Sequence, residues 1–191
     1  QASAAVLFDV NNRAVLYSKN AHERLYPASL TKVMTALVAL QNASPDTVLT
    51  ATDSVKITES GAQLCGLKAG DTMTLDQALH ILLMYSANDA AMLIAENIGG
   101  SVDHFVEMMN DKARLLGLTG THFENPNGLD APEHYSTARD LAVLAAYAME
   151  NPIFAKTVST KTVTVGERYL KNHNKLLWLA DGAEGIKTGY T

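Results

Sequence analysis

The sequence predicts an α+β fold in which strands at both ends of the chain enclose a helical middle. Residues 6–10 and 14–17 alternate apolar and polar side chains around Asn11-Asn12-Arg13, which predicts a β-hairpin. Residues 162–165 and 168–170 alternate around Gly166-Glu167 and predict a second hairpin. Between them, apolar residues recur at helical spacing. The order strands, helices, strands is typical of an α+β protein with a helical insertion.

The helical middle is delimited by recognisable start and stop signals. Thr74 to Gln77 has the pattern of a capping box, and Gly117 is a normal helix stop. Residues 119–135 are rich in Asn, Pro and Gly, and so long an ordered loop is usually functional. A strand is expected at the end of the chain, over 185–191. Helices are expected over about 28–40, 75–85, 90–98, 102–116 and 136–149.

Composition excludes several classes of protein. The chain has 191 residues, of which 47% are hydrophobic, which suits one globular domain of two lobes. Its net charge is −5 and it has no basic run, so nucleic acid is not an expected partner. Cys65 is the only cysteine, which rules out an internal disulfide and is typical of a small buried hydrophobe.

No signal peptide or membrane span is evident in the sequence, because polar residues interrupt every long apolar run. The first residues, 1–5, are small and polar, as expected of a mature chain after signal removal. That start alone does not establish export.

A small polar pair, Ser29 and Lys32, lies at the start of an otherwise apolar helix. Ser29 could cap that helix while Lys32 extends along the surface. Alternatively, residues three apart share one helix face, so a neutral Lys32 amine could remove the proton of the Ser29 hydroxyl. Burial and neighbouring positive charge lower the pKa of a lysine and make that second interpretation chemically possible. The pair alone does not decide between them.

Two further short motifs bear on this choice. Ser86-Ala87-Asn88 interrupts a helical run, and both side chains can serve one cleft only from a turn between helices. Lys187-Thr188-Gly189 supplies a cation, a hydroxyl and a residue without Cβ, beside which a peptide can lie. Taken singly, each has an ordinary structural explanation, as a helix cap or as an edge lysine.

Together, S-x-x-K, S-x-N and K-T-G in this order match the signature of penicillin-binding proteins and serine β-lactamases. Residues 18–20 also read S-x-N, but they precede the S-x-x-K motif and end a hairpin. The chain resembles the low-molecular-weight penicillin-binding proteins that act as D-alanyl-D-alanine carboxypeptidases. The segments that carry this resemblance are PASLTK (27–32), SANDA (86–90), FENPNGLD (123–130), HYSTARD (134–140), NHNKLL (172–177) and GIKTGYT (185–191).

The resemblance implies a serine peptidase that forms an acyl-enzyme. Ser29 is then the nucleophile and Lys32 its general base, while Ser86 relays a proton to the leaving D-alanine. Asn88 holds the substrate amide. Lys187 keeps the site positive, which helps to lower the pKa of Lys32 and attracts the terminal carboxylate. The substrate implied is a peptidoglycan stem peptide ending in D-Ala-D-Ala, and β-lactams are expected to acylate the same serine. The resemblance also implies action outside the cytoplasm, in the periplasm or at the outer face of the cell membrane, after signal peptide removal.

The resemblance also assigns the edge of the cleft. Thr188 and Gly189 line the strand beside which the peptide lies. The backbone N–H groups of Ser29 and Tyr190 form the expected oxyanion hole. No cofactor is expected, and no metal, because the six histidines are scattered without metal-ligand spacing. His134 and His173 are expected to hold their loops by hydrogen bonds.

The architecture implied is that of the β-lactamase/transpeptidase-like fold, an antiparallel sheet flanked by helices plus an all-helical lobe. The sheet lobe is expected over about 1–47 and 150–191, and the helical lobe over about 48–149. In that family the catalytic domain continues past K-T-G with two strands and a helix. Residues 1–191 are therefore expected to be an incomplete catalytic domain that a C-terminal fragment or a second chain complements.

Two other functions share the signature. A serine β-lactamase needs fast deacylation, which class A enzymes drive with a loop glutamate, but the sequence around Glu124 does not fit that context. A non-catalytic penicillin sensor or sporulation protein would keep the fold and acylate without turnover.

Overall fold

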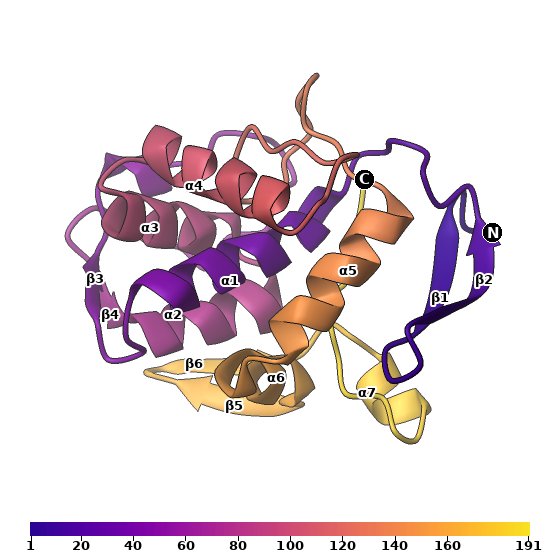
Figure 1. Cartoon of the computed structure of the whole chain (residues 1–191). Helices are drawn as coiled ribbons and strands as arrows, with labels where there is room; N and C mark the ends of the chain where they lie inside the picture. The colour runs from indigo at the N-terminus through magenta and orange to yellow at the C-terminus, as the bar shows by residue number, and fades with distance from the viewer.

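The computed structural model describes residues 1–191, and its helices form a block beside which a β-hairpin stands apart (Figure 1). Helix α5 lies between that hairpin, β1–β2, and the block formed by α1 to α4 (Figure 1). The elements are β1 (Ala5–Asp9), β2 (Ala14–Lys19), α1 (Thr31–Asn42), β3 (Val48–Thr50), β4 (Thr72–Thr74), α2 (Leu75–His80), α3 (Asn88–Gly99), α4 (Val102–Leu115), α5 (Ala138–Met149), α6 (Pro152–Ser159), β5 (Thr162–Val165), β6 (Arg168–Lys171) and α7 (Leu176–Leu179).

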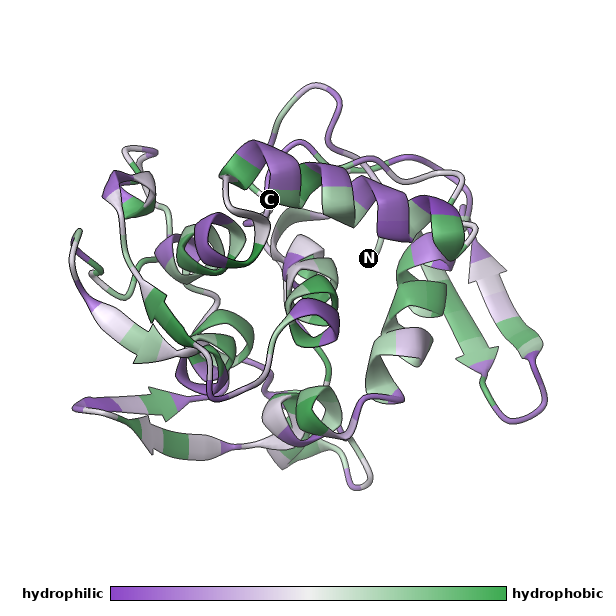
Figure 2. Cartoon of the chain, turned by 60° about the vertical axis from the view of Figure 1, so that its left-hand side comes forward, coloured by the Kyte–Doolittle hydropathy of each residue, from purple (hydrophilic) through white to green (hydrophobic).

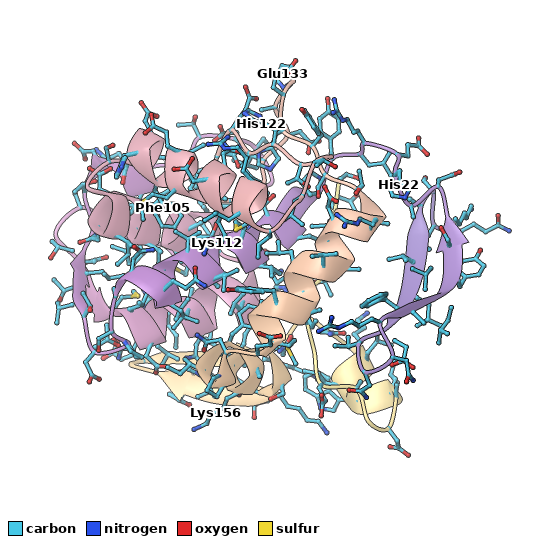
Figure 3. All side chains as sticks on the ribbon, in the orientation of Figure 1. His22, Phe105, Lys112, His122, Glu133 and Lys156 are labelled. Carbon is cyan, nitrogen blue, oxygen red and sulfur yellow. The ribbon has the colours of Figure 1, made fainter.

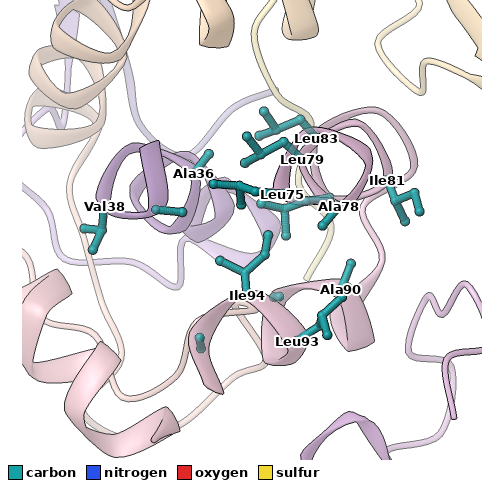
Figure 4. Close-up of a cluster of buried hydrophobic side chains, with 14 of the residues drawn as sticks. Ala36, Val38, Leu75, Ala78, Leu79, Ile81, Leu83, Ala90, Leu93 and Ile94 are labelled. Carbon is teal, nitrogen blue, oxygen red and sulfur yellow. The ribbon is translucent and has the colours of Figure 1, made fainter. Parts of the chain in front are cut away.

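Helix α1 is the centre of the hydrophobic core. All residues from Thr31 to Ala39 are buried, so this helix is enclosed on every side, as its mostly apolar sequence predicts. Side chains of α2 and α3 pack against it, among them Leu75, Leu79 and Ile94 (Figure 4). The apolar faces of the helices point towards one another and their polar faces point outwards (Figure 2).

The predicted capping box at the start of α2 is confirmed. The Thr74 hydroxyl accepts the N–H of Gln77, and the Gln77 side chain accepts the N–H of Thr74. Helix α2 continues into a π-helical turn at Ile81–Tyr85, and α3 follows at Asn88. Such turns are rare and are frequently found at functional sites.

The strands form three separate two-stranded antiparallel sheets, namely β1–β2, β3–β4 and β5–β6. The first and last are the two predicted hairpins. In the β1–β2 turn Arg13 has a positive φ, and Asn11 and Asn12 donate their backbone N–H groups to the Asp9 carboxylate. The α+β class is confirmed.

The predicted strand over 185–191 is wrong. This segment makes no backbone hydrogen bond with any other part of the chain, and a strand is defined by such pairing. Several elements were not predicted, namely β3, β4, α6 and α7, all of eight residues or fewer. Two helices begin later than predicted, α1 at Thr31 after a short 3-10 turn and α5 at Ala138.

None of the helices combines the length and apolar character needed to cross a bilayer.

The long loop over 119–135 is present as predicted and projects from the helical block. Glu133 lies at its tip and His122 nearer its base (Figure 3). Its two arms pair through His122 and Tyr135, and Ser136 pairs in turn with Leu25. The loop thereby joins the segment that precedes α1, where Ser29 lies.

Candidate active site

Ser29 and Lys32 lie in the turn that leads into α1. Ser29 belongs to a 3-10 turn, Ala28–Leu30, and its side chain caps neither that turn nor α1. Ala28 has φ +48°, a left-handed conformation that costs an L-residue energy and that clusters at functional sites. Lys32 has no exposed surface. Capping by Ser29 and a surface-extended Lys32 are therefore both excluded.

The Lys32 amine has three oxygen neighbours. Its Nζ lies 2.8 Å from Ser29 Oγ, 2.8 Å from Asn88 Oδ1 and 2.6 Å from the carbonyl oxygen of Asn127. The last two oxygens can only accept hydrogen bonds. A neutral amine that gives its two hydrogens to them keeps its lone pair for the third neighbour, the Ser29 hydroxyl. This geometry is what a general base for Ser29 requires.

The electrostatics of the site favour that neutral amine. Burial, and secondarily the charge of Lys187, lower the pKa of Lys32 to about 6. Burial alone lowers the pKa of Lys187 to about 8, so near neutral pH Lys187 is charged and Lys32 is mostly neutral. The predicted influence of Lys187 on Lys32 is confirmed, although burial is the larger cause.

Ser86 and Asn88 reach the site from the junction of the π-helical turn and α3. Ser86 takes a left-handed conformation, φ +63°, and ends the turn, while Asn88 opens α3. This break in the helix directs two side chains that are two residues apart into the same cleft, as predicted. Ser86 Oγ accepts a hydrogen bond from Lys187 Nζ at 3.1 Å. Lys32 and Lys187 therefore each contact one serine hydroxyl.

A polar cleft of about 520 Å³ lies above these groups. Every site residue predicted from the sequence lines it except the two lysines, of which Lys32 is buried and Lys187 half-buried. Gly189 runs close to Leu30, whose Cγ would lie 3.3 Å from an added Cβ. The residues that line the cleft are Ser29, Ser60, Gly61, Ala62, Gln63, Ser86, Asn88, Gly128, Leu129, His173, Thr188, Gly189 and Tyr190.

The long loop contributes to the environment of the base in a way that the sequence did not predict. The carbonyl of Asn127 accepts from Lys32, and the carbonyl of Pro126 accepts from the Thr35 hydroxyl at 2.6 Å. Gly128, at φ +93°, passes so near Ala28 that an added Cβ would lie 1.9 Å from its carbonyl oxygen. The Asn-Pro-Asn-Gly composition indicated a functional loop, but not which atoms it would present.

A second missed residue is Asp89, which organises the opposite wall of the cleft. Its buried carboxylate accepts the backbone N–H groups of Cys65, Gly66 and Leu67. It thereby holds the segment that follows Gln63, whose carbonyl accepts the N–H of Asn88. Burial and the nearby Asp89 raise the pKa of Cys65 to about 12, so its thiol stays protonated, as expected of a structural cysteine.

His134 has the structural role predicted for it, and His173 has it only in part. Glu124 donates its N–H to His134 Nδ1, so the proton lies on Nε2, which donates to the Thr31 hydroxyl at 2.8 Å. Burial lowers the pKa of His134 to about 4 and keeps it neutral. For His173 the predicted side-chain bond is absent. Its backbone N–H donates to Met84, and its ring packs on Tyr85.

Comparison with known proteins agrees with this geometry. A family model described as D-alanyl-D-alanine carboxypeptidase matches residues 1–191. The chain is 38% identical to D-alanyl-D-alanine carboxypeptidase DacF of Bacillus subtilis, covering all of this chain and 51% of that protein. It is 37% identical to DacD of Escherichia coli, again over the whole chain and 52% of the relative. The chain thus spans about half the length of these curated relatives.

Solved structures give the same result. A serine-to-alanine mutant of the Streptomyces K15 DD-transpeptidase matches with a TM-score of 0.92 and 32% identity, over 100% of this chain and 81% of that one. A D-alanyl-D-alanine carboxypeptidase from Mycobacterium tuberculosis matches with a TM-score of 0.91 and 37% identity, over 100% and 73%. Because these matches cover the whole chain, they include both its strands and its helices. By its sequence, its fold and the arrangement of its serines and lysines, the chain belongs to the D-alanyl-D-alanine carboxypeptidase family.

Proposed function

We propose that the protein is a serine D-Ala-D-Ala carboxypeptidase that removes the terminal D-alanine from peptidoglycan stem pentapeptides. The observation that carries the proposal is the contact between Ser29 Oγ and the fully buried amine of Lys32. A lysine with a pKa of about 6 is a competent general base near neutral pH. The family of the chain and the names of its relatives indicate the same activity.

The first half of the reaction acylates the serine. Ser29 Oγ attacks the carbonyl carbon of the penultimate D-alanine while its proton passes to Lys32 Nζ. The N–H groups of Ser29 and Tyr190, which both line the cleft, would stabilise the negative oxygen that develops. The carbon–nitrogen bond then breaks, and the leaving amine takes up the proton through Ser86. Lys187, bonded to Ser86, would attract the substrate's terminal carboxylate.

The second half of the reaction hydrolyses the acyl-enzyme with water. A β-lactam would enter by the same acylation step. No aspartate or glutamate lines the cleft, and Glu124 Oε2 instead accepts the N–H of Glu133. Because class A β-lactamases deacylate with a loop glutamate, and no carboxylate lines this cleft, the site favours a carboxypeptidase over a β-lactamase of that kind. Acting on the cell wall, the protein would work outside the cytoplasm.

Labelling with a fluorescent penicillin, together with D-alanine release from a pentapeptide, tests this function. We expect both with the native protein and neither with Ser29→Ala, because the acyl-accepting oxygen is then missing. Ser60→Ala is the matched control, since Ser60 lines the same cleft but has no lysine partner. Labelling without release would identify a penicillin sensor, and rapid antibiotic hydrolysis a β-lactamase. No labelling of folded protein would refute the proposal.

The proposal extends to the organisation of the domain. Residues 1–47 and 150–191 would form the sheet lobe, and residues 48–149 the helical lobe, with the cleft between them. Strands from a further segment, either in the same polypeptide or in another, would complete the sheet. Two observations support this: residues 186–191 form no hydrogen bond with the backbone of another segment, and an apolar cavity of about 410 Å³ lies between β1, α5 and Ile186.

Hydrogen exchange tests the completion of the sheet. In residues 1–191 alone, the amides of 187–190 should exchange at nearly the rate of an unstructured peptide, because no carbonyl accepts them. With the completing segment present, they should slow by about 100-fold or more, as amides paired in a sheet do. Protected amides in a monomer of residues 1–191 alone would contradict the proposal.

A further inference from the structure

One wall of the catalytic cleft is a segment without helix or strand, residues 60–67, here called the 60–67 wall. Four of its residues line the cleft, namely Ser60, Gly61, Ala62 and Gln63. Residues 60, 61 and 63 are exposed, and their backbone N–H groups donate to no other group of the chain. Because main-chain hydrogen bonds are a common way to hold an extended peptide, this wall is suited to contact one.

The 60–67 wall is attached to the protein mainly through two consecutive residues, Asn88 and Asp89. The N–H of Asn88 donates to the Gln63 carbonyl at 2.8 Å. The Asp89 carboxylate accepts the N–H groups of residues 65–67 at 2.9 to 3.0 Å. The only other hydrogen bond from the wall to a distant segment is a long contact of 3.5 Å with Arg168. The position of the wall therefore depends on the start of α3.

Asp89 is a rigid anchor for this wall. It is 1% exposed, and no lysine, arginine or histidine forms an ion pair with it. Backbone N–H groups alone compensate its carboxylate, those of the wall and that of Ala90. Helix α3 continues with Ala90, Leu93 and Ile94, which pack into the hydrophobic core (Figure 4). The carboxylate is thereby fixed from one side by the core while it holds the wall on the other.

The wall lies beside the residue that is expected to hold the substrate amide. Asn88 binds Gln63 through its backbone, and its side chain lies 2.8 Å from Lys32 Nζ. Lys32 and Ser29 belong to α1 and the turn before it, and the long loop also binds Lys32. None of these elements accepts or donates a hydrogen bond to Asp89. Displacement of the wall would therefore change how a peptide binds, but not the contact between nucleophile and base.

We propose that Asp89 is a positioning residue that fixes the 60–67 wall against the acyl part of the stem peptide. It acts on the affinity for the peptide and not on the rate of bond cleavage. Contacts remote from the reacting carbonyl bind the substrate and the transition state equally, so their loss raises KM and leaves kcat unchanged. The inference rests on the proposed function and adds to it a residue that governs KM.

Asp89→Asn tests this role with little change of shape. Both carboxylate oxygens accept N–H groups of the wall, and an amide nitrogen cannot, so contacts are lost whichever way the amide turns. We expect KM for the pentapeptide to rise by about ten-fold and kcat per active molecule to stay within about two-fold of native. The fraction labelled by saturating penicillin gives the number of active molecules. A residue with only a structural role would lower that fraction and leave KM unchanged, which would overturn the inference.

Asp103→Asn is the matched control. Asp103 lies in the first turn of α4 as Asp89 lies in the first turn of α3, so both substitutions remove a negative charge from a helix start. Asp103 is exposed and does not line the cleft. Its substitution should leave KM and the labelled fraction unchanged.

Cys65 gives a second readout that does not depend on turnover. It is the only cysteine of the chain, and Asp89 contributes to the raised pKa that keeps its thiol protonated. Because the thiolate is the reactive form, an aromatic disulfide reagent should modify Cys65 at least about ten-fold faster in Asp89→Asn than in native protein. Asp103→Asn should react at the native rate. Equal rates in all three proteins would show that Asp89 does not anchor the wall.

Gln63→Ala tests the wall without disturbing its anchor. The exposed Gln63 side chain lines the cleft, while the backbone carbonyl that binds Asn88 remains. KM should rise by about three-fold or more with no change in thermal unfolding, since a hydrogen bond to the peptide is lost. If Asp89→Asn does not fold, an unchanged KM in Gln63→Ala overturns the inference.

These measurements separate failure of the inference from failure of the proposed function. An unchanged KM in Asp89→Asn would overturn the role of Asp89 even though the native protein releases D-alanine. Native protein that neither labels with penicillin nor releases D-alanine would instead refute the reaction, while faster modification of Cys65 in Asp89→Asn would still support the anchor.

Discussion

Lys32→Met should lower the rate of penicillin acylation by about 10³-fold or more, because Ser29 then has no base within hydrogen-bonding distance. Methionine keeps the unbranched apolar stem but has neither the lone pair nor the charge of the amine. The measurement is the second-order rate of labelling by a fluorescent penicillin. Lys56→Met is the control, since Lys56 is largely exposed and pairs only with Asp53. An acylation rate within ten-fold of native would contradict the assignment of Lys32 as the base.

The same variant should show how much the burial of Lys32 lowers the stability of the folded protein, and how that cost depends on pH. In the unfolded chain Lys32 titrates near 10.5, and in the folded chain its pKa is about 6. Between these pH values the unfolded chain binds the extra proton, so native stability rises with pH by up to about 1.4 kcal/mol per unit through this group. Lys32→Met should therefore have its largest stability advantage over the native protein near pH 6, and that advantage should shrink towards pH 10.

Chemical denaturation at several pH values measures this difference. A gap between native and Lys32→Met proteins that does not change with pH would show that Lys32 is charged in the folded state. The acylation rate should give the complementary profile. It should rise with pH as Lys32 loses its proton near pH 6, and fall above about pH 8 as Lys187 loses the charge that attracts the carboxylate.

Gly128→Ala should cost several kcal/mol of stability and lower penicillin labelling by about 100-fold or more. The added Cβ would lie 1.9 Å from the Ala28 carbonyl oxygen and 3.0 Å from the Ser29 nitrogen, both of which are backbone atoms that cannot rotate away. Either the long loop or the turn that carries Ser29 must move. Movement of the turn displaces the nucleophile, and movement of the loop removes the Asn127 carbonyl from Lys32.

Gly70→Ala separates this clash from ordinary backbone strain. Gly70 has φ +94°, nearly equal to that of Gly128, but an added Cβ there meets no atom within 4 Å. It should cost only about 1–2 kcal/mol, the price of an alanine at positive φ, and should leave labelling intact. Equal effects of the two substitutions would show that the close approach of Gly128 to Ala28 has no role. Thermal unfolding and labelling, measured on both variants, give the comparison.

The parts of the fold that the sequence predicted are those with a strong local signal. The α2 capping box, the helices of the middle and two hairpins follow from side-chain periodicity and caps, which act over a few residues. The segment over 185–191 has the same kind of alternation, yet it forms no strand, because pairing depends on a distant partner. Strands β3 and β4 have three residues each, too few for a period to emerge.

The candidate site shows the same division between local and distant information. The motif order pointed to Ser29, Lys32, Ser86, Asn88 and Lys187. In the structure, Lys32 contacts the side chains of Ser29 and Asn88, while Lys187 contacts the side chain of Ser86. The two serines and Asn88 line the same cleft. The contribution of Asn127 could not be predicted, since it is made by a backbone carbonyl and every residue has one. The same holds for Asp89, whose partners are three backbone N–H groups on a remote segment.

The three oxygen neighbours of Lys32 make it possible to measure the fraction of molecules that are in the active form. They belong to segments separated from Lys32 by 3, 56 and 95 positions, and no two of them share an element. A molecule in which any one of these segments has detached has an amine that is solvated, charged and unable to act as a base. A covalent penicillin label therefore records only molecules in which all three segments are docked. The fraction of protein that is labelled, measured at increasing denaturant concentration, reports how many molecules still have all three segments in place.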